Sequence, residues 1–274
     1  MPELPEVEQV RKTLLPHIKG KKIEQAEIRL PRMVLSPALP DFIREVEGRR
    51  FTDVKRRGKY LLLELDDDAV LLTHLRMTGA LLALPKNGSE PSFGRIRFRL
   101  SGAEDLWFTD IRTFGTIRLL HPGEFFLDKG FASLGPEPLS EAFTTEYLQA
   151  MAKKSRQAIK SFLLDQRKIA GLGNIYADEA LAVAGIRPTR VAAGLSGKKI
   201  AALHAAVNQV IAQGLRHRGT TFRNYQDAEG HQGSNKEHLL VYGRKGQPCK
   251  GCGAPLKQIK VGGRGSVYCP RCQK

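Results

Sequence analysis

Long apolar runs and export signals are both missing from this chain of 274 residues. No stretch comes near the roughly 18 uninterrupted apolar residues that a membrane span needs. The acidic, proline-rich start has neither the basic region nor the apolar core of a secretion signal. Internal repeats and low-complexity tracts are absent as well, and 41% of the residues are hydrophobic, enough for one large domain or two smaller ones. We therefore expect a globular, cytoplasmic protein that does not bind membranes.

Cysteine is scarce, and its placement is specific. The four cysteines fall within the final 26 residues, as Cys249-x2-Cys252 and Cys269-x2-Cys272. Each Cys-x2-Cys turn directs two thiolates at one ion, and two such turns complete a tetrahedral zinc site. Two disulfides are the alternative, but disulfides are rare in a reducing compartment. Because four cysteine ligands leave no open coordination position, the expected Zn²⁺ is structural.

Acidic residues are missing from the C-terminal stretch. From Leu240 to Lys274 there are eight lysines and arginines and no Asp or Glu, and the whole chain carries a formal charge of +16. A second basic cluster, KKSRQAIK, spans Lys153 to Lys160. Cations that meet phosphates release condensed counterions, so nucleic acid is the favoured partner. A merely basic surface and an anionic membrane are the alternatives, although no basic amphipathic helix with a lipid-facing aromatic edge is present.

The order of the expected elements predicts two domains joined near residue 135. A helix starts within MPELPEVEQV, where Pro5 suits the first turn and Val7, Val10 and Leu14 have helical spacing. Residues 22–120 are mainly strands, with KYLLLEL and AVLLTHL forming one hairpin and RIRFRL and DLWFTD another. The linker SLGPEPLSEAF follows, and helices are expected at 144–153, 156–166, 174–184 and 196–217. A cleft between the two domains would suit an extended ligand.

Three further segments are functional candidates. AGLGNIYADEAL places two glycines and Asn174 before a helix, where a phosphate can bind, although simple turn chemistry is the commoner reason for this pattern. The polar stretch 219–238 has little periodicity, and we expect a mobile loop that closes over a ligand. In the hairpin between the cysteine pairs, Arg264 lies among three glycines. It is either a phosphate-facing finger or a solvated charge.

Together these motifs resemble the formamidopyrimidine-DNA glycosylase family over the whole chain. The resemblance is carried by PELPEVE, RRGKY, HLRMTG, DIRTFG, LGPEPL, GLGNIYADEAL and YGRKGQPCKGCG…GRGSVYCPRCQK. It implies an α+β multidomain fold with three parts: an N-terminal catalytic β-sandwich flanked by helices (1–132), a helical helix-two-turn-helix domain with a lesion-capping loop near 219–238 (133–238), and a zinc-finger hairpin (239–274).

The resemblance also implies an activity. The family's enzymes excise oxidised purines, such as 8-oxoguanine and formamidopyrimidines, and then cut the strand by β,δ-elimination. This chain is therefore expected to be a bifunctional DNA glycosylase and AP lyase that repairs damaged double-stranded DNA by base excision. It would act as a monomer associated with the nucleoid.

Individual residues take roles from the same resemblance. Removal of Met1 frees the secondary amine of Pro2, and because an α-amino group titrates near about 7.7–8, it can attack C1′ of a damaged nucleotide and form a Schiff base. Glu3 is the adjacent acid and base, Lys59 assists near the sugar and base, and Arg264 holds phosphate during elimination. The positions that match DNA contacts are His74, Met77, Phe93, Arg112, Phe114, Arg156, Lys160, Asn174, Thr220 and Tyr242.

Some of these assignments have alternatives. Met77, Arg112 and Phe114 match the trio that fills the gap left by an extruded nucleotide, although spacing alone would favour a core position for Met77 and Phe114. Several relatives have His-x-His where this chain has Phe93-Gly94-Arg95, so Arg95 is a further source of charge there.

Two other functional classes stay open. One is a sister enzyme resembling endonuclease VIII, which prefers oxidised pyrimidines, and the other is a catalytically silent DNA-binding module. The start PELPE, Arg112-x-Phe114 and the loop after Gly219 favour the purine enzyme over the first. Intact Pro2 and Glu3, with Lys59, disfavour the second.

Overall fold

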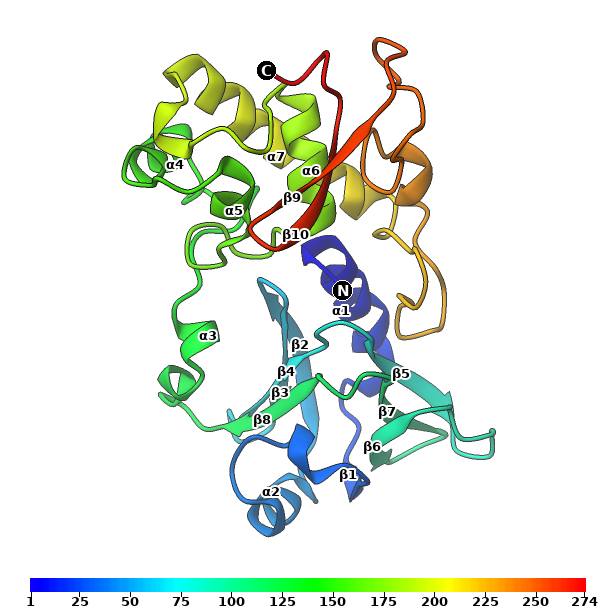
Figure 1. Ribbon diagram of the computed structural model, residues 1–274. Helices are drawn as coiled ribbons and strands as arrows, with labels where there is room; N and C mark the ends of the chain where they lie inside the picture. Colours follow the sequence, from blue (N-terminus) through cyan, green and yellow to red (C-terminus); the bar gives the residue numbers. More distant parts are fainter. The chain divides into compact units, whose positions relative to one another are not determined.

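The computed structural model describes all 274 residues, which form two compact units (Figure 1). Unit 1 contains Met1–Ala132 and His217–Ser234, and unit 2 contains Ser133–Arg216 and Asn235–Lys274. The first boundary therefore falls at the start of the expected linker. One segment differs from the sequence-based grouping: residues 217–234 were expected with the helical domain, but they pack with unit 1 because they bond the first helix along its length.

Unit 1 is built from two four-stranded antiparallel sheets, with strand orders β1-β6-β7-β5 and β2-β3-β4-β8. The strands are β1 (Ile23–Ile28), β2 (Phe51–Arg57), β3 (Tyr60–Leu65), β4 (Val70–His74), β5 (Gly79–Pro85), β6 (Gly94–Leu100), β7 (Glu104–Asp110) and β8 (Thr116–Leu120). Both predicted hairpins are confirmed, since β3 pairs with β4 and β6 pairs with β7. In each pair alternate residues face one apolar core, as half-buried strands require.

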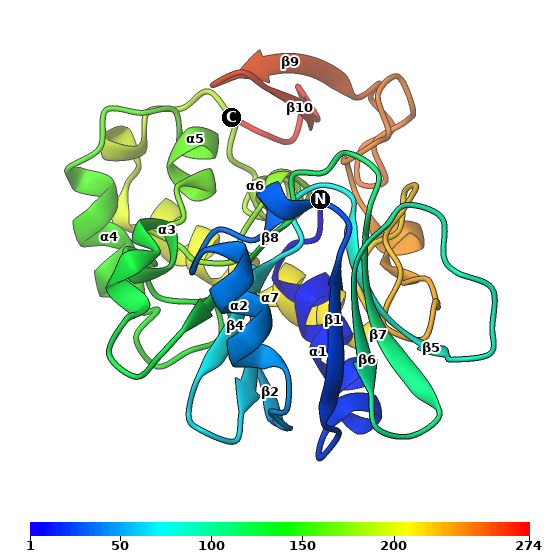
Figure 2. The same ribbon diagram turned by 90° about the horizontal axis from the view of Figure 1, so that it is seen from below.

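Helix α1 (Leu4–Ile18) joins the two sheets of unit 1. It contacts β2 and β3 of one sheet and β5 of the other, and Figure 2 shows it among strands of both. Its residues Val7, Val10 and Leu14 have no exposed surface and share one core with inward-facing residues of both sheets. The expected amphipathic first helix is thus confirmed.

Two short α-helices also belong to unit 1. They are α2 (Leu39–Val46) and α3 (Lys129–Ala132). The sequence reading missed α2, which lies in a region read as strands. Its apolar residues Leu39, Phe42, Ile43 and Val46 have helical spacing, so the signal was present in the sequence but was overlooked among the neighbouring strands.

Unit 2 is helical apart from one hairpin. Its elements are α4 (Thr145–Lys153), α5 (Ile159–Leu164), α6 (Asn174–Val183), α7 (Gly197–Arg216), β9 (Lys257–Val261) and β10 (Arg264–Tyr268). The four predicted helices are therefore present, and α5 is shorter than expected. Helices α6 and α7 approach closely at Gly214, where a Cβ would come within 2.5 Å of the buried Tyr176 hydroxyl. No helix of the chain has both the length and the apolar character needed to cross a membrane.

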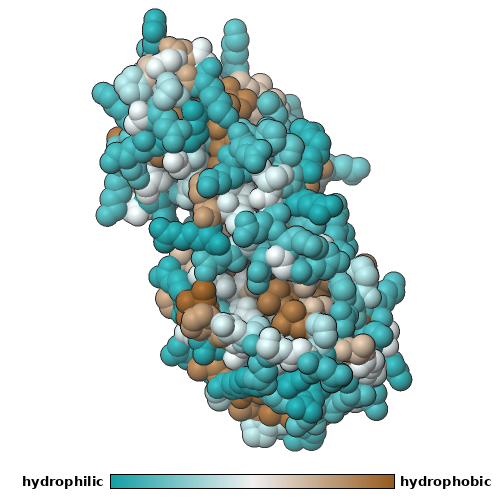
Figure 3. Space-filling view, turned by 90° about the vertical axis from the view of Figure 1, so that its right-hand side faces the viewer, coloured by the Kyte–Doolittle hydropathy of each residue, from teal (hydrophilic) through white to brown (hydrophobic).

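Apolar side chains are a minority on the face drawn in Figure 3, where they form small patches among hydrophilic residues. Large exposed apolar side chains are therefore candidates for contact with a ligand. Met77, Phe93 and Phe114 are among them, with exposed fractions of 39%, 50% and 52%. These exposures exclude the core positions that spacing alone favoured for Met77 and Phe114.

Candidate active site and nucleic-acid contacts

The start of α1 carries the predicted nucleophile and its neighbouring acid. Pro2 is buried, and Glu3, the N-cap residue of α1, is 2% exposed. Glu3 and Glu6 form a capping box in which the Glu3 backbone N–H donates to Oε2 of Glu6 at 2.8 Å. Because a capping box fixes the path of the chain into a helix, the backbone that carries Pro2 is held at one place.

Lys59 and His74 add a second polar group to unit 1. Lys59 lies in the turn between β2 and β3 and is 5% exposed. Burial, followed by the positive charges of Arg76 and Lys59, lowers the pKa of His74 to about 3. The Arg76 N–H donates to Nδ1 of this neutral ring at 3.0 Å, which leaves the proton on Nε2. His74 is therefore neutral, and its Nε2–H can donate a hydrogen bond to a phosphate oxygen.

Met77, Arg112 and Phe114 lie together at the surface of unit 1. The Arg112 guanidinium is 4.9 Å from the centre of the Phe114 ring, and its Nη1 is 3.1 Å from Sδ of Met77. The structure thus brings the predicted trio into one exposed group, although its members come from two separate segments of the chain.

The turn that presents this trio is organised by Asp110, a residue that sequence reasoning missed. Its carboxylate has no exposed surface and accepts the Arg112 N–H at 3.1 Å, the Thr78 hydroxyl at 2.5 Å and the Gly115 N–H at 2.7 Å. Gly115 is required here because a Cβ would lie 2.5 Å from the Phe108 ring. The DIRTFG motif therefore encodes a fixed turn as well as its exposed tip.

Phe93 lies beside the same turn. Its backbone carbonyl accepts the Asp110 N–H at 3.1 Å, and it adopts a left-handed φ of +61°. Arg95 donates through Nε to the Asp110 carbonyl at 2.9 Å and lies over the Phe93 ring at 5.7 Å. An exposed aromatic ring and a guanidinium therefore lie together at positions 93 and 95.

Thr220 lies in the part of segment 217–234 that contacts α1. It is 3% exposed, and its N–H donates to Oε1 of Glu6 at 2.7 Å. One buried carboxylate, that of Glu6, therefore receives both the N–H of Glu3 and the N–H of Thr220.

In unit 2, Arg264 is the exposed first residue of β10 and follows the turn Gly262-Gly263, which has φ values of +53° and +77°. A Cβ on Gly262 would collide with the side chain of Ser161 on α5, so the hairpin tip rests on that helix. Asn174, the first residue of α6, donates through Nδ2 to the Gly265 carbonyl at 3.3 Å. Arg264 thus projects from a tip that two helices support.

Lys160 does not have the position expected of a phosphate contact. Its side chain has no exposed surface, and its Nζ lies 2.8 Å from Oδ1 of Asp178 and donates to the Gly265 carbonyl at 2.6 Å. Asp178 also accepts the Ser266 hydroxyl at 2.6 Å and the Val267 N–H at 3.1 Å. In this structure Lys160 ties helices α5 and α6 to β10, and it has no exposed surface with which to meet a phosphate. Arg156, from the same basic cluster, is exposed.

The neighbouring acid Glu179 holds the segment that leads to the zinc finger. Its buried carboxylate accepts the N–H groups of Leu240, Val241 and Tyr242 at 2.6, 2.9 and 2.8 Å. Burial raises the pKa of Glu179, and the three N–H groups oppose that shift. Tyr242, a predicted DNA contact, is thus fixed through its backbone. Asp178 and Glu179 were both missed as functional supports.

The four cysteine thiols lie together at the base of the β9–β10 hairpin. The Cys249 and Cys272 sulfurs are 4.0 Å apart, those of Cys252 and Cys269 are 3.5 Å apart, and all four lie within 4.8 Å of one another. A tetrahedron with Zn–S bonds of about 2.3 Å has edges of about 3.8 Å, so the cluster fits Zn²⁺ and is too open for disulfides. Four thiolates saturate the ion, which gives it a structural role.

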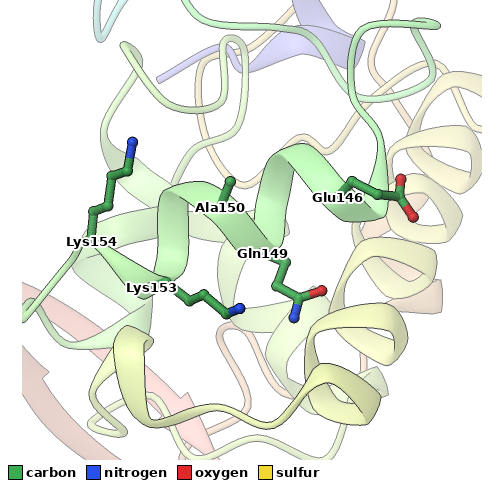
Figure 4. Close-up of a pocket in the computed structure, with 5 residues that line it drawn as sticks. All are labelled: Glu146, Gln149, Ala150, Lys153 and Lys154. Atoms are coloured by element: carbon green, nitrogen blue, oxygen red, sulfur yellow. The ribbon is translucent and has the colours of Figure 1, made fainter.

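The hollow of about 450 Å³ beside α4 contains none of the predicted site residues. Figure 4 shows its polar side chains, including Glu146, Lys153 and Lys154, pointing in different directions. A binding pocket requires polar groups that converge, so we assign this hollow no function.

Family comparisons agree with this geometry. Residues 1–117 match the model of the formamidopyrimidine-DNA glycosylase N-terminal domain, residues 134–226 match that family's H2TH domain, and residues 246–274 match the zinc finger found in FPG and IleRS. Formamidopyrimidine-DNA glycosylases from Desulforamulus reducens and Bacillus licheniformis are 44% and 42% identical to the chain. The alignments cover all of the chain and 99% and 100% of those proteins.

Solved structures give the same result. A mutant Lactococcus lactis FPG in complex with Fapy-dG DNA is 36% identical, with full coverage of both chains and a TM-score of 0.94. The wild-type Lactococcus lactis FPG in complex with DNA containing an oxidised pyrimidine is also 36% identical, with full coverage and a TM-score of 0.93. Fold and site together define a zinc-finger DNA repair enzyme. The chain belongs to the formamidopyrimidine-DNA glycosylase family.

Proposed function

We propose that this protein excises 8-oxoguanine and formamidopyrimidines from duplex DNA and then cleaves the strand by β,δ-elimination, through a Schiff base on Pro2. The observation that carries the proposal is the capped, buried start of α1, which holds Pro2 beside Glu3. Family membership and the DNA complexes of the structural neighbours support it. The charge of +16 suits a DNA ligand. We infer a monomer that acts on chromosomal DNA.

The chemistry depends on a free Pro2 amine, which removal of Met1 provides. The amine attacks C1′ and forms an N–C1′ bond, while the bond from C1′ to the damaged base breaks and the base leaves with a proton. Opening of the sugar then gives the iminium form. Glu3, next in the chain, is the group that moves a proton to or from the sugar oxygen.

The later steps need cations near the sugar and the flanking phosphates. Lys59, which is buried in unit 1, supplies a charge close enough to His74 to help lower the pKa of that ring. Arg264 on the supported hairpin tip would hold a phosphate through both eliminations. In the first, the C2′ proton is lost and the 3′ phosphate leaves; in the second, the C4′ proton is lost and the 5′ phosphate leaves. His74, Asn174, Arg156 and Tyr242 would contact other phosphates.

The exposed trio is proposed to replace the extruded nucleotide. Phe114 would wedge the base step, Met77 would fill the gap, and Arg112 would hydrogen-bond the orphaned partner base. Turning a nucleotide out of the stack costs a few kcal/mol, and an aromatic ring with a guanidinium above it can replace part of the lost stacking. Phe93 adds a second exposed ring beside this turn.

The decisive experiment traps the covalent intermediate. Purified protein is incubated with a duplex that carries 8-oxoguanine opposite cytosine, with cyanoborohydride present, and the adduct is mapped by mass spectrometry. We expect the DNA remnant on the N-terminal peptide. A matched variant with one alanine inserted before Pro2 should give no adduct, because an amide nitrogen is not nucleophilic. Trapping on an internal lysine such as Lys59, with full activity in the extended variant, would refute the proposal.

A panel of substrates distinguishes the proposed purine glycosylase from an endonuclease VIII-like enzyme and from a silent DNA-binding module. Duplexes with 8-oxoguanine, an oxidised pyrimidine or a ready-made abasic site are compared at equal enzyme concentration. Faster excision of 8-oxoguanine supports the proposal, and faster excision of the pyrimidine favours the endonuclease VIII-like alternative. Binding without any cleavage would identify a silent DNA-binding module.

A further inference from the structure

Helix α1 carries a polar stripe beside its core-facing residues. Glu6, Gln9, Thr13 and His17 follow a spacing of three, four and four residues, which places them on one side of the helix. Each of the four bonds a residue of segment 217–234, and all of these contacts lie within unit 1. Most of the stretch 219–238, which the sequence predicted to be a mobile loop, lies in this segment, and the segment is attached to α1 once per turn.

The first attachment joins the segment to the catalytic end of α1. Oε1 of Glu6 accepts the Thr220 N–H at 2.7 Å, while Oε2 accepts the Glu3 N–H at 2.8 Å. Gly219 leaves room for this contact, because a Cβ there would lie 2.8 Å from the Glu6 side chain. The Tyr225 hydroxyl adds a bond to the Glu6 carbonyl at 3.3 Å.

The second attachment is a buried turn at Asp227 and Ala228. Asp227 is 2% exposed, and its carboxylate accepts the N–H groups of Glu229 and His231 at 3.1 and 2.9 Å and the Gln9 amide at 3.3 Å. The Ala228 N–H donates to the Thr13 hydroxyl at 3.0 Å.

Strand β5 and the core hold the same turn from the other side. The Ala228 carbonyl accepts the Ala83 N–H at 3.1 Å, and the Ala228 side chain lies fully buried in the core of unit 1. The turn is therefore fixed by α1, β5 and the core together.

Between these attachments the chain is exposed. Phe222, Arg223 and Asn224 are exposed, whereas Thr220 and Thr221 before them and Asp227 and Ala228 after them are buried. A three-residue tip held at both ends loses less conformational freedom when it contacts a ligand than a free loop does.

We propose that Gln9, Thr13 and Asp227 are positioning residues for lesion recognition: they fix the 222–224 tip on α1, so that the tip and Pro2 are held by one helix. The inference rests on the proposed function and assigns the stripe a part in base excision. Strand cleavage at a ready-made abasic site has no damaged base to recognise, so it should not depend on the stripe.

The test compares Thr13→Val with Thr13→Ser. Valine removes the acceptor of the Ala228 N–H without changing the size of the side chain, and serine keeps the hydroxyl. We expect Thr13→Val to lower kcat/KM for excision of 8-oxoguanine by about tenfold, as the loss of one buried acceptor allows. Cleavage of an abasic duplex should stay within about twofold, and Thr13→Ser should retain both activities. Lys12→Ala, an exposed change on α1, is the matched control.

A physical readout accompanies the kinetics. Hydrogen exchange at the Ala228 N–H, and tryptic cleavage after Arg223, should be faster in Thr13→Val than in the wild type and Thr13→Ser. Equal losses on both substrates, or unchanged exchange and excision in Thr13→Val, would overturn the inference. If the wild type itself excised no base, the proposed function would fail instead, while the exchange measurement would still test the attachment.

Discussion

The ammonium group of Lys160 lies 2.8 Å from the carboxylate of Asp178, and neither side chain has any exposed surface. Lys160 comes from α5 and Asp178 from α6, and both bond the strand that begins at Arg264, through Gly265 and Ser266. A buried ion pair at this point makes the orientation of the finger depend on two helices. Burial raises the pKa of Asp178, and the Lys160 charge opposes that shift.

Removing one partner of this pair should be costly. Asp178→Asn leaves a buried ammonium without a counter-charge, and we expect the free energy of unfolding to fall by about 3–5 kcal/mol. Changing both partners, with Lys160→Met and Asp178→Leu, should recover part of the loss. Denaturant unfolding of the zinc-loaded protein measures both effects. A loss below about 1 kcal/mol for Asp178→Asn would show that the pair does not stabilise the fold.

The salt dependence of DNA binding should distinguish a phosphate contact, expected for Arg156, from the buried structural role of Lys160. Arg156→Ala should reduce the slope of log K against log salt by about one, with unchanged stability, because its guanidinium is exposed. Lys160→Met should lower stability and leave that slope unchanged. The opposite pattern would restore Lys160 as a phosphate contact.

These residues show what the sequence could and could not predict. The hairpins, the helices of unit 2 and the zinc ligands were predictable because their signals are local. Lys153, Lys154, Arg156 and Lys160 look alike within KKSRQAIK, yet only Lys160 is buried, because Asp178 on another helix receives it.

Buried acids escaped sequence analysis for the same reason. The N–H groups that Glu179 accepts lie 61 to 63 residues further along the chain and become visible only when the chain folds. The bond between Glu6 and Thr220 joins positions 214 residues apart. No local pattern distinguishes such a carboxylate from a solvated one.

Loss of a zinc ligand should weaken DNA binding without unfolding unit 1. Cys252→Ser removes one of four thiolates, so metal content should fall and the Arg264 tip should lose its support. We expect lesion DNA affinity to fall by at least about a hundredfold, while the unit 1 core remains folded. Metal analysis, a binding titration and near-ultraviolet circular dichroism of Trp107 provide the measurements. Full zinc content and affinity in Cys252→Ser would contradict the assignment.

Arg112 should affect duplex substrates more than single strands. Arg112→Ala removes both the contact with the Phe114 ring and the donor to the partner base, so preference for cytosine opposite the lesion should weaken by about 1–3 kcal/mol. Activity on a single-stranded abasic substrate should change little. Phe114→Ala should likewise lower activity on duplex substrates more than on single strands, and Phe126→Ala, which alters another exposed phenylalanine of unit 1, is its matched control. Equal losses on duplex and single-stranded DNA would rule out the wedge role.

His17 should make the attachment of segment 217–234 depend on pH. Partial burial lowers the pKa of His17, but its contacts with Glu104 at 2.8 Å and Glu229 at 3.4 Å outweigh that effect and raise it. A raised pKa means that the contribution to stability is present below about pH 6.5 and is lost as the pH rises through the folded-state value. The difference in Tm between wild type and His17→Gln should therefore be larger at pH 5.5 than at pH 8.5. Glu104→Gln should reduce the pH dependence of this Tm difference. A Tm difference that grew as the pH rose would contradict the stabilising role of charged His17.

Glu3→Gln tests the acid and base role without disturbing the helix start. Glutamine keeps a carbonyl oxygen for the capping box with Glu6, but it cannot accept or release the catalytic proton. Lesion DNA should therefore bind with nearly unchanged affinity, while single-turnover excision of 8-oxoguanine should fall by about 10²–10⁴-fold, the range of general acid–base catalysis. Cleavage at a ready-made abasic site should fall less, because the base has already left and only elimination remains. Equal losses on the two substrates would place Glu3 in the elimination steps, and weaker DNA binding with unchanged single-turnover excision would reduce it to a helix cap.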